Sequence, residues 1–383
     1  MLRYAAFVHR GLSRSANIVH ALASWPYDVS VRPRRVVAVH GRPCMRARLE
    51  DVARQANVHP ATASRALNER TRHRVSPDTL NRVLAVAREL NYLPNSMARS
   101  LASARSFTIG VIVGDLAVPL FADLLRGIDD VATAAGYSTL IVDTANDRGR
   151  ELTHLRNLGA QRVDGLVVTT NMLGDPDGSA RFTAIAPTIN LLRASEQATE
   201  PEVVSNDESG MRQIVDHLVS LGHSRIAHVA GPPTISTAVA RLRGYRLAML
   251  EHGLVPDDDL IVTVDQIGPT QGRTACGWLV ENTDCTAITG FNDLVTFGVL
   301  KELRARKIGC PDDISVAGYS DIPAADLVHP ALTTVSVDHY EMGAEAARLL
   351  LRTLDDSGDH HAASVRFPVH LVVRESTGPV SAR

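Results

Sequence analysis

The sequence predicts a small all-α domain followed by a larger α/β body of two doubly wound lobes, each built on a parallel sheet. Two observations lead to this fold class. Residues 49–92 contain three short runs with helical apolar spacing and no strand-like run. From residue 107 onward, uniformly apolar runs of strand length alternate with helical patterns. Such runs are typical of parallel strands that helices cover on both faces.

The first two helices of the small domain are expected to form a helix-turn-helix. An apolar stripe over residues 49–56 precedes Asn57, a residue type that tolerates the left-handed turn conformation. A second helix is expected to begin at Pro60, which suits a first helical turn. The small residues Ala63 and Ala66 should pack on the first helix, so this pair of helices can approach closely.

A third helix is expected where Ser76 can cap the chain and Pro77 can occupy the first turn. Pro94 should end this helix, because proline lacks the backbone donor that a helix interior needs. It also permits a new, short helix over residues 95–102. Alone, a helix of that length is too short to be stable in water.

In the body, six apolar runs are expected to be parallel strands with helices between them. They are residues 107–114, 138–144, 162–170, 225–231, 286–291 and 314–319. In doubly wound sheets, ligands bind outside the carboxyl ends of the strands. Candidate binding residues are therefore expected directly after these runs.

The charge of the chain is strongly uneven. Residues 1–45 carry seven Arg against one acid, and residues 46–105 carry eleven Arg against five acids, so each segment is +6. Because the whole chain is −2, residues 106–383 carry about −14. A basic front on an acidic body indicates a module that binds a polyanion. A solvated basic face is the alternative.

Several classes of protein are disfavoured by what the sequence lacks. Its four cysteines have no CxxC or ligand-type spacing, so neither disulfides nor a metal site is expected, and reduced thiols fit a cytoplasmic protein. No run of 18 apolar residues could cross a membrane. No GxSxG, HExxH or Walker motif is present, so no catalytic residue and no cofactor is predicted.

Residues 1–45 show no sustained helical or strand period and make a poor signal peptide. We expect this segment to be disordered or to be a mis-assigned N-terminal extension. Met45 stands four residues before the first amphipathic helix, where translation would be expected to start. Peptides from 1–44 in the endogenous protein, detected by mass spectrometry, would contradict the second interpretation.

The exposed side of the second helix has a composition suited to reading DNA. With Ala63 and Ala66 turned inward, Pro60, Ala61 and Arg65 remain free to face outward. In the major groove, Arg reads guanine and a small apolar group meets the thymine methyl. A helical hairpin with an incidental Arg is the alternative interpretation.

Longer stretches carry a family resemblance. The segments "LEDVARQANVHPATASRALN", "VSPDTLNRVLAVARELNYLPNSMARSLAS", "LGHSRIAHVAGPP", "PDDISVAGYSDIP" and "LVVREST" occur in the order found in the lactose-repressor (LacI/GalR) family of bacterial transcription regulators. The resemblance covers residues 48–377. It implies a helix-turn-helix headpiece, a hinge helix and a two-lobed body like that of periplasmic sugar-binding proteins.

The resemblance assigns DNA-binding roles to eight positions. Pro60 and Ala61 fall where the family discriminates operators, Arg65 falls at a guanine-contacting position, and Leu101 falls at the minor-groove wedge, where an apolar side chain kinks the duplex. A linker residue packed on the body is the alternative for Leu101. The full DNA-binding set is Pro60, Ala61, Thr62, Ser64, Arg65, Asn95, Arg99 and Leu101.

Three departures from the family pattern affect this helix pair. His59 stands where Ser often caps the second helix, so the cap is expected to be weaker. Asn57 stands where Gly is common, and the segment 68–74 is longer and more basic than usual. Residues Thr62 and Ser64 are expected to contact phosphate or to cap the helix.

In the body, the resemblance places a small-molecule effector between the lobes. The expected effector-binding residues are Asp115, Leu120, Phe121, Thr237, Arg241, Ile267, Asn292 and Asp293. Among these, Asp293 could accept two sugar hydroxyls while Arg241 donates to others. Structural ion pairing is the alternative for both, and a core position is the alternative for Phe121. Aliphatic Leu120 and Ile267, where a purine-binding member would have rings, favour a sugar or sugar derivative.

The expected organisation is an N-terminal extension (1–45), a headpiece (46–93), a hinge helix and linker (94–105) and an effector-binding and dimerisation body (106–383). The resemblance implies a homodimer on a near-palindromic double-stranded operator, with a tetramer as the alternative, and no contact with a membrane. Release of DNA by the effector, as in a repressor, is favoured over promotion of binding. A secreted sugar-binding protein without a regulatory role is the competing hypothesis.

Overall fold

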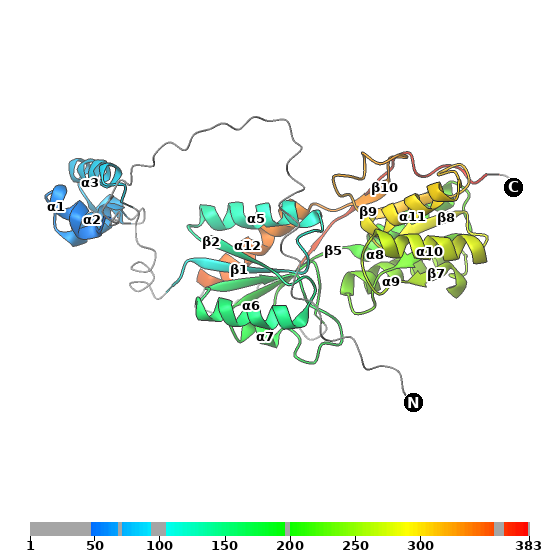
Figure 1. Ribbon diagram of the computed structural model, residues 1–383, viewed down its shortest axis with the longest axis horizontal. Helices are drawn as coiled ribbons and strands as arrows, with labels where there is room; N and C mark the ends of the chain where they lie inside the picture. Colours follow the sequence, from blue (N-terminus) through cyan, green and yellow to red (C-terminus); the bar gives the residue numbers. More distant parts are fainter. Residues whose placement is uncertain (1–46, 68–70, 93–104, 196–199, 356–363, 382–383) are drawn as a thin grey trace, which may run out of the picture. The chain divides into compact units, whose positions relative to one another are not determined.

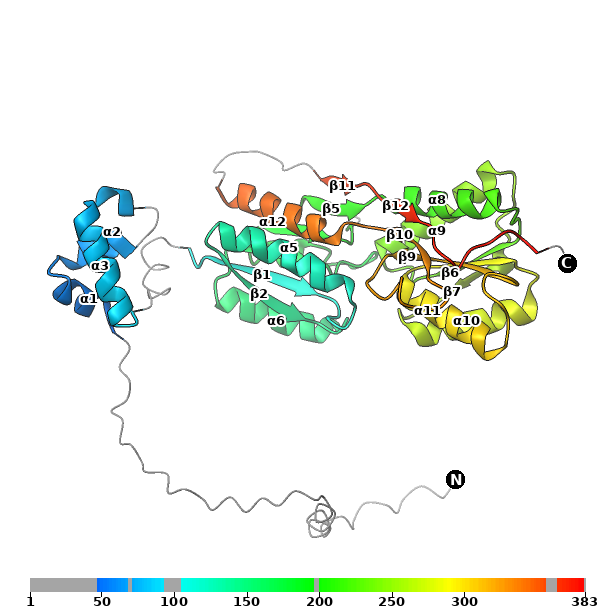
Figure 2. The ribbon, with the colours of Figure 1, turned by 90° about the horizontal axis from the view of Figure 1, so that it is seen from above.

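The computed structural model describes residues 47–67, 71–92, 105–195, 200–355 and 364–381. By its internal contacts the chain divides between Pro94 and Asn95 into two compact units. We call the described part of the first unit the headpiece and that of the second unit the body (Figures 1 and 2). The expected N-terminal extension and hinge helix lie outside the described residues.

The headpiece is all-α, as predicted. Its elements are α1 (Leu49–Gln55), α2 (Pro60–Leu67), the 3-10 turn η1 (Arg72–Arg74) and α3 (Pro77–Glu89). Its core is built largely from small side chains, which lets the three helices approach closely. These buried residues are Val52, Ala53, Ala56, Ala63, Ala66, Val83, Val86 and Ala87.

Both α1 and α3 end in the same hydrogen-bonded motif. Asn57 has a φ of 52°, and the next amide, that of Val58, donates to the Ala53 carbonyl at 2.9 Å. Asn91 has a φ of 46°, and the Tyr92 amide donates to a carbonyl in the last turn of α3. This is the left-handed helix stop that usually takes Gly. Helix α3 therefore ends before Pro94, the residue that the sequence had predicted to end it.

The first lobe of the body is a six-stranded parallel sheet with helices on both faces. Its strand order is β11-β5-β4-β3-β1-β2. The strands are β1 (Thr108–Val113), β2 (Ser138–Asp143), β3 (Gly165–Val168), β4 (Thr188–Leu191), β5 (Glu202–Ser205) and β11 (Val365–Phe367). Helices α5 (Leu120–Ala134) and α12 (His339–Asp355) cover one face; α6 (Arg148–Ala160) and α7 (Ala180–Thr183) cover the other (Figure 1).

The second lobe repeats this architecture with one strand reversed. Its order is β12-β10-β9-β8-β6-β7, and β12 pairs antiparallel with β10, so this sheet is not wholly parallel. The strands are β6 (Ile226–Ala230), β7 (Ile261–Thr263), β8 (Ala287–Gly290), β9 (Ser315–Ser320), β10 (Thr333–Ser336) and β12 (His370–Val372). The helices are α8 (Asp207–Ser220), α9 (Ser236–Glu251), α10 (Pro269–Asn282) and α11 (Asp293–Ala305), with the turn η2 (Asp258–Leu260) before β7.

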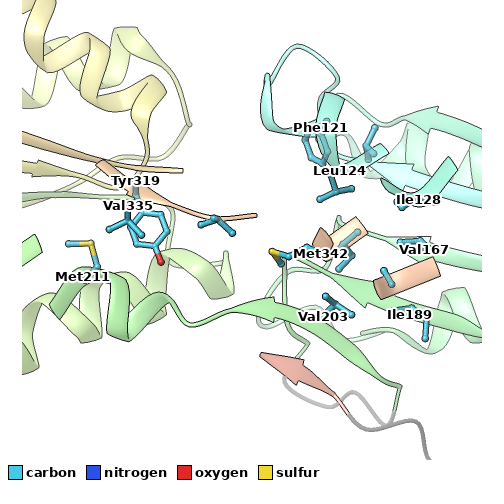
Figure 3. Close-up of a cluster of buried hydrophobic side chains, with 14 of the residues drawn as sticks. Phe121, Leu124, Ile128, Val167, Ile189, Val203, Met211, Tyr319, Val335 and Met342 are labelled. Atoms are coloured by element: carbon cyan, nitrogen blue, oxygen red, sulfur yellow. The ribbon is translucent and has the colours of Figure 1, made fainter. Parts of the chain in front are cut away.

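Three passages of the chain connect the lobes: β5 to α8, β10 to α12, and β11 to β12. Two of them are hydrogen-bonded to each other, because the Asn206 amide donates to the Phe367 carbonyl at 2.9 Å. The largest apolar cluster includes residues from both sides of these passages (Figure 3). Met211, Tyr319 and Val335 belong to the second lobe, and Val203 and Met342 to the first.

Within the described residues, no helix is long and apolar enough to cross a membrane. In the same residues, no group of three or more His, Cys, Asp or Glu side chains is placed to hold a metal ion. Cys276, Cys285 and Cys310 are free thiols.

Candidate functional site

Helix α2 presents a polar and basic outer face. Ala61, Ser64 and Arg65 are exposed, whereas Ala63 and Ala66 are buried against the rest of the headpiece, as the spacing predicted. Within the part of the chain that the structure describes, the Arg65 guanidinium has no ion-pair partner. Its charge is therefore available to an external acceptor. Pro60 and Thr62 are partly buried at the same helical end.

His59 does cap this helix. Its Nδ1 accepts a hydrogen bond from the Ala61 amide at 3.2 Å, in the role that a Ser hydroxyl often fills. An accepting Nδ1 carries no proton, so the ring proton is on Nε2. The distance is at the long end of the normal range, which agrees with the weak cap expected from the sequence. At α3, by contrast, the Ser76 hydroxyl bonds to the Thr79 hydroxyl at 3.0 Å and not to a backbone amide.

Three of the predicted DNA-binding residues, Asn95, Arg99 and Leu101, lie outside the described residues. So do residues 68–70 of the basic loop. The remainder of that loop forms η1, where Arg72 and Arg74 are exposed.

In the body, a cleft of about 910 Å³ is lined by residues of both lobes. Seven of the eight predicted effector-binding residues lie in its lining: Asp115, Leu120, Phe121, Thr237, Arg241, Ile267 and Asn292. Asp293 is not among the lining residues. Two hydrogen bonds join the lobes beside the cleft, from the Leu173 amide to the Thr234 carbonyl at 2.7 Å and from the Ala194 amide to Ser236 Oγ at 2.9 Å.

Arg241 lies in the cleft and also holds the lobes' connection together. It is 7% exposed, its Nε donates to Asp207 Oδ1 at 2.9 Å, and its Nη1 donates to the Phe291 carbonyl at 2.9 Å. The guanidinium carbon lies 3.7 Å from the ring centroid of Tyr319. Arg241 therefore forms the structural ion pair of one interpretation and also lines the cavity, as the effector-binding interpretation expects.

Asp293 is turned away from the cleft and is fully buried. Its Oδ1 accepts from Thr334 Oγ1 at 2.6 Å, and its Oδ2 accepts from the Ile322 amide at 2.9 Å. The carboxylate thereby ties the start of α11 to β10 and to the loop that follows the cleft residue Ser320. Each oxygen of the Asp293 carboxylate therefore has a donor within the protein, an arrangement that favours a positioning role for this residue.

Burial raises the pKa of Asp293 to about 6, although hydrogen bonds from Thr334 and Ile322 act in the opposite direction. Between about pH 4 and 6, Asp293 is therefore protonated in the folded state but ionised in the unfolded chain. As pH rises through this window, the contribution of Asp293 to the free energy of unfolding falls. We therefore expect the difference in free energy of unfolding between Asp293→Asn and the wild type to rise by about 2 kcal/mol, in favour of the variant, from pH 4.5 to pH 7.5.

Urea unfolding followed by tryptophan fluorescence, at fixed protein concentration, measures this difference. Asp259→Asn, which removes an exposed carboxylate of the same lobe, is the matched control. Parallel pH profiles for the wild type and Asp293→Asn would contradict the assignment.

Two further predicted residues have local structural roles. Asn292 caps α11, because its Oδ1 accepts from the Val295 amide at 3.0 Å. Asp115 Oδ1 accepts from the Ala117 amide at 2.9 Å in the turn that follows β1. Phe121 lines the cleft and also belongs to the apolar core, with 8% of its surface exposed.

The sequence did not indicate an ion-pair network on the first-lobe side of the cleft. Glu151 is 4% exposed and accepts from Arg148 at 3.1 Å, from Arg181 at 2.9 Å and from the Thr170 hydroxyl. Asp175 accepts from the same two arginines at 2.9 and 2.6 Å. Arg148 follows shortly after β2, so the rule of strand ends could have drawn attention to it. Nothing local in the sequence pairs it with Arg181.

The headpiece and body both match known proteins. Residues 48–95 match the family described as "Bacterial regulatory proteins, lacI family", and residues 215–377 match a "Periplasmic binding protein-like domain". The chain is 31% identical to the HTH-type transcriptional regulator DegA of Bacillus subtilis (strain 168) over 88% of its own length and 100% of the relative's. The chain belongs to the LacI family of bacterial regulatory proteins.

Solved structures of a repressor and of a transcriptional regulator agree with this assignment. The lac repressor dimer bound to operator and the anti-inducer ONPF aligns with a TM-score of 0.77 at 30% identity, covering 87% of this chain and 100% of that one. A complex of the transcriptional regulator CelR with cellobiose aligns with a TM-score of 0.65 at 28% identity, covering 86% and 100%.

LacI-family membership decides between the functional classes that the sequence left open. The chain is a DNA-binding transcriptional regulator and neither an enzyme nor a secreted binding protein, because its relatives over nearly their whole length are regulators. The predicted fold class, a helix-turn-helix headpiece with a two-lobed periplasmic-binding-protein-like body, is confirmed.

Proposed function

We propose that this protein is a repressor whose affinity for a near-palindromic operator is controlled by a sugar or sugar derivative bound in the cleft. The observation that carries the proposal is a ligand-sized cleft, lined by both lobes, in a chain that also carries an outward-facing Arg65 on a capped α2. Pockets of 300–1,000 Å³ are typical of small-molecule sites. The name of the CelR–cellobiose complex supports a sugar as the ligand class.

On the DNA side, Pro60, Ala61 and Arg65 would contact base edges, and Thr62 and Ser64 would contact phosphates. Phosphate contacts set the register of the protein, and base contacts specify the sequence. In this proposal a hinge helix lies within residues 94–105, between the headpiece (46–93) and the body (106–383). Asn95, Arg99 and Leu101 of this segment would also contact DNA. A chain that reads an operator would act in the cytoplasm.

A homodimer would present two copies of α2 to the two halves of a near-palindromic site. The lac repressor dimer on its operator supports this assembly.

The effector would act by favouring one arrangement of the lobes over the other. Three connecting passages allow hinge motion, and the cleft residues come from both lobes, so a ligand contacts both only when they are suitably placed. A ligand shifts such an equilibrium only by its difference in affinity for the two states. Release of the operator is the expected outcome of effector binding.

Replacing Arg65 by Ala should lower operator affinity by about 10- to 100-fold, because a guanine-contacting Arg contributes about 1–3 kcal/mol of base discrimination. The measurement is a gel shift with the full chain and DNA from upstream of its own coding region, at fixed salt. Binding to unrelated DNA of the same length should weaken much less.

Arg88→Ala is the matched control, since it removes an exposed arginine from α3 of the same headpiece. If Arg65→Ala weakens upstream and unrelated DNA equally, as loss of a single phosphate contact would, the base-reading role of Arg65 is wrong. If the wild type fails to prefer the upstream fragment, the regulatory proposal for that fragment is wrong.

A further inference from the structure

Four arginines line the cleft, and three of them are already paired. Arg148 and Arg181 are held by Glu151 and Asp175, and Arg241 is held by Asp207. The fourth, Arg193, makes no ion pair or side-chain hydrogen bond with any described residue. It is the cleft's one uncommitted guanidinium within the described part of the chain.

Arg193 is not an ordinary surface arginine. It is partly buried at the first-lobe side of the cleft, just after β4. Burial lowers the pKa of Arg193 to about 10, with only partial opposition from the charge of Glu151. Glu151 itself is saturated by Arg148, Arg181 and Thr170. Holding a partly desolvated cation without a partner is costly, so proteins rarely do it without a function.

The backbone around Arg193 is tightly fixed. Leu192 has a φ of 68°, a left-handed conformation that is unfavourable for a branched side chain, and the Arg193 amide donates to the Leu191 carbonyl at 2.8 Å. The Leu192 amide donates to the Val203 carbonyl at 2.9 Å, and the Ala194 amide donates across to Ser236 Oγ of the other lobe. Strain of this kind is concentrated at binding sites. It places Arg193 beside a contact that joins the two lobes.

The acidic residues of the lining do not neutralise Arg193. Asp115 and Asp147 accept bonds from the backbone amides of Ala117 and Arg150, and Asp265 is exposed. Another polar group facing the cleft is His339 at the start of α12. Burial and the charge of Arg241 lower the pKa of His339 to about 4, so its ring is neutral at pH 7 and can donate a hydrogen bond.

We propose that the effector of this protein carries an anionic group, a phosphate or a carboxylate, and that Arg193 binds it. This inference rests on the proposed function, because it concerns the same cleft. The planar guanidinium matches either oxyanion with two parallel hydrogen bonds. A neutral sugar could accept hydrogen bonds from Arg193, but it would leave the charge of the guanidinium uncompensated when the cleft excludes water. The effector class is therefore a sugar phosphate or a sugar acid.

The test uses the full chain and inorganic phosphate as the probe. Phosphate titrated at constant ionic strength should raise the melting temperature of the wild type to a plateau, since binding to the folded state stabilises it. In Arg193→Met the saturable rise should be absent. Arg193→Lys keeps the charge and loses the fork, so its phosphate midpoint should increase by about 10-fold.

Arg156→Met is the matched control, because Arg156 is exposed on α6 of the same lobe and does not line the cleft. It should behave as the wild type does. Equal phosphate responses in the wild type and Arg193→Met, including no response in either, overturn the proposal. Should Arg193→Met fail to fold, an unchanged midpoint in Arg193→Lys overturns it.

A second arm separates the two sources of the anion. Glucose 6-phosphate, gluconate and glucose are compared by calorimetry on the wild type and Arg193→Met. At least one of the two anions should bind about 10-fold or more tightly than glucose, with the excess lost in Arg193→Met. Glucose binding that equals both anions in the wild type contradicts the proposal.

These readouts use no DNA, so the two proposals can fail separately. A chain that shows the Arg193-dependent phosphate response but no preference for upstream DNA contradicts only the proposed function. A chain that prefers upstream DNA but lacks the phosphate response contradicts only the anionic effector.

Discussion

Replacing Arg241 by Met is expected to lower the free energy of unfolding of the body by about 3–5 kcal/mol, the usual cost of removing one partner of a buried ion pair. Asp207, which is 3% exposed, would keep the Ser205 hydroxyl at 3.1 Å as a donor but would lose its cationic partner. The Phe291 carbonyl would lose its bond, and the ring of Tyr319 would lose the stacked guanidinium. Because Asp207 begins α8 at a lobe connection, the damage would fall on the hinge.

Chemical unfolding at fixed protein concentration measures this loss. The control is Arg243→Met on the same helix, where an exposed arginine lies 3.4 Å from Glu208 and should contribute less than about 1 kcal/mol. Adding Asp207→Asn to Arg241→Met should recover part of the loss, since no buried charge then lacks a partner. A cost for Arg241→Met no greater than that for Arg243→Met contradicts this account.

The position of Arg241 suggests how binding in the cleft could reach the hinge. Its guanidinium lines the cleft while its Nε holds Asp207 at the β5–α8 connection. A ligand that hydrogen-bonds to Arg241 would therefore contact the residue that holds Asp207 at a connection between the lobes. Coupling of this kind needs a physical element with two arrangements, and the three connecting passages are the candidate for it.

The sequence predicted most of the fold because its signals are local. The left-handed Asn57, the buried Ala63 and Ala66, and the alternation of strands and helices are all read from neighbouring residues. Six strands were not among those expected: β4, β5, β7, β10 and the three-residue strands β11 and β12, of which β12 is reversed. Strands of that length carry no periodicity, and their pairing is decided by partners about 35 and 160 residues away in sequence.

The cleft was predicted less completely, for a physical reason. The family resemblance assigned Asp115 and Asn292 to it, and both follow directly on recognised strands, where the rule of strand ends also expects ligand groups. Asp293 follows the same strand, but the first turn of α11 directs its side chain toward Thr334 and Ile322. Arg193 was missed because β4, which precedes it, was not among the strands expected. That no described residue pairs with its side chain becomes visible only in three dimensions.

Replacing Gly343 by Ala is expected to destabilise the first lobe by about 3 kcal/mol or more. Helices α5 and α12 cross at a pair of glycines, so a Cβ on Gly343 would lie 2.0 Å from the Leu124 carbonyl oxygen. A Cβ on the facing Gly127 would lie 2.0 Å from the Tyr340 carbonyl oxygen. Both obstacles are backbone atoms, and no change of rotamer can relieve them. The helices would have to separate along a contact that covers one face of the sheet.

The matched control is Gly159→Ala in α6 of the same lobe, where the new Cβ would meet only the flexible end of Ile185 at 3.3 Å. Gly159 lies in the last turn of α6, where Gly→Ala reduces the freedom of the unfolded chain and favours the helix by less than about 1 kcal/mol. The same substitution should therefore have opposite signs at the two positions, as read from urea midpoints. Because α12 follows directly from the β10 connection, the Gly343→Ala protein should also lose its response to a cleft ligand. Equal midpoints for the two variants would mean that the close crossing of α5 and α12 does not limit the stability of this lobe.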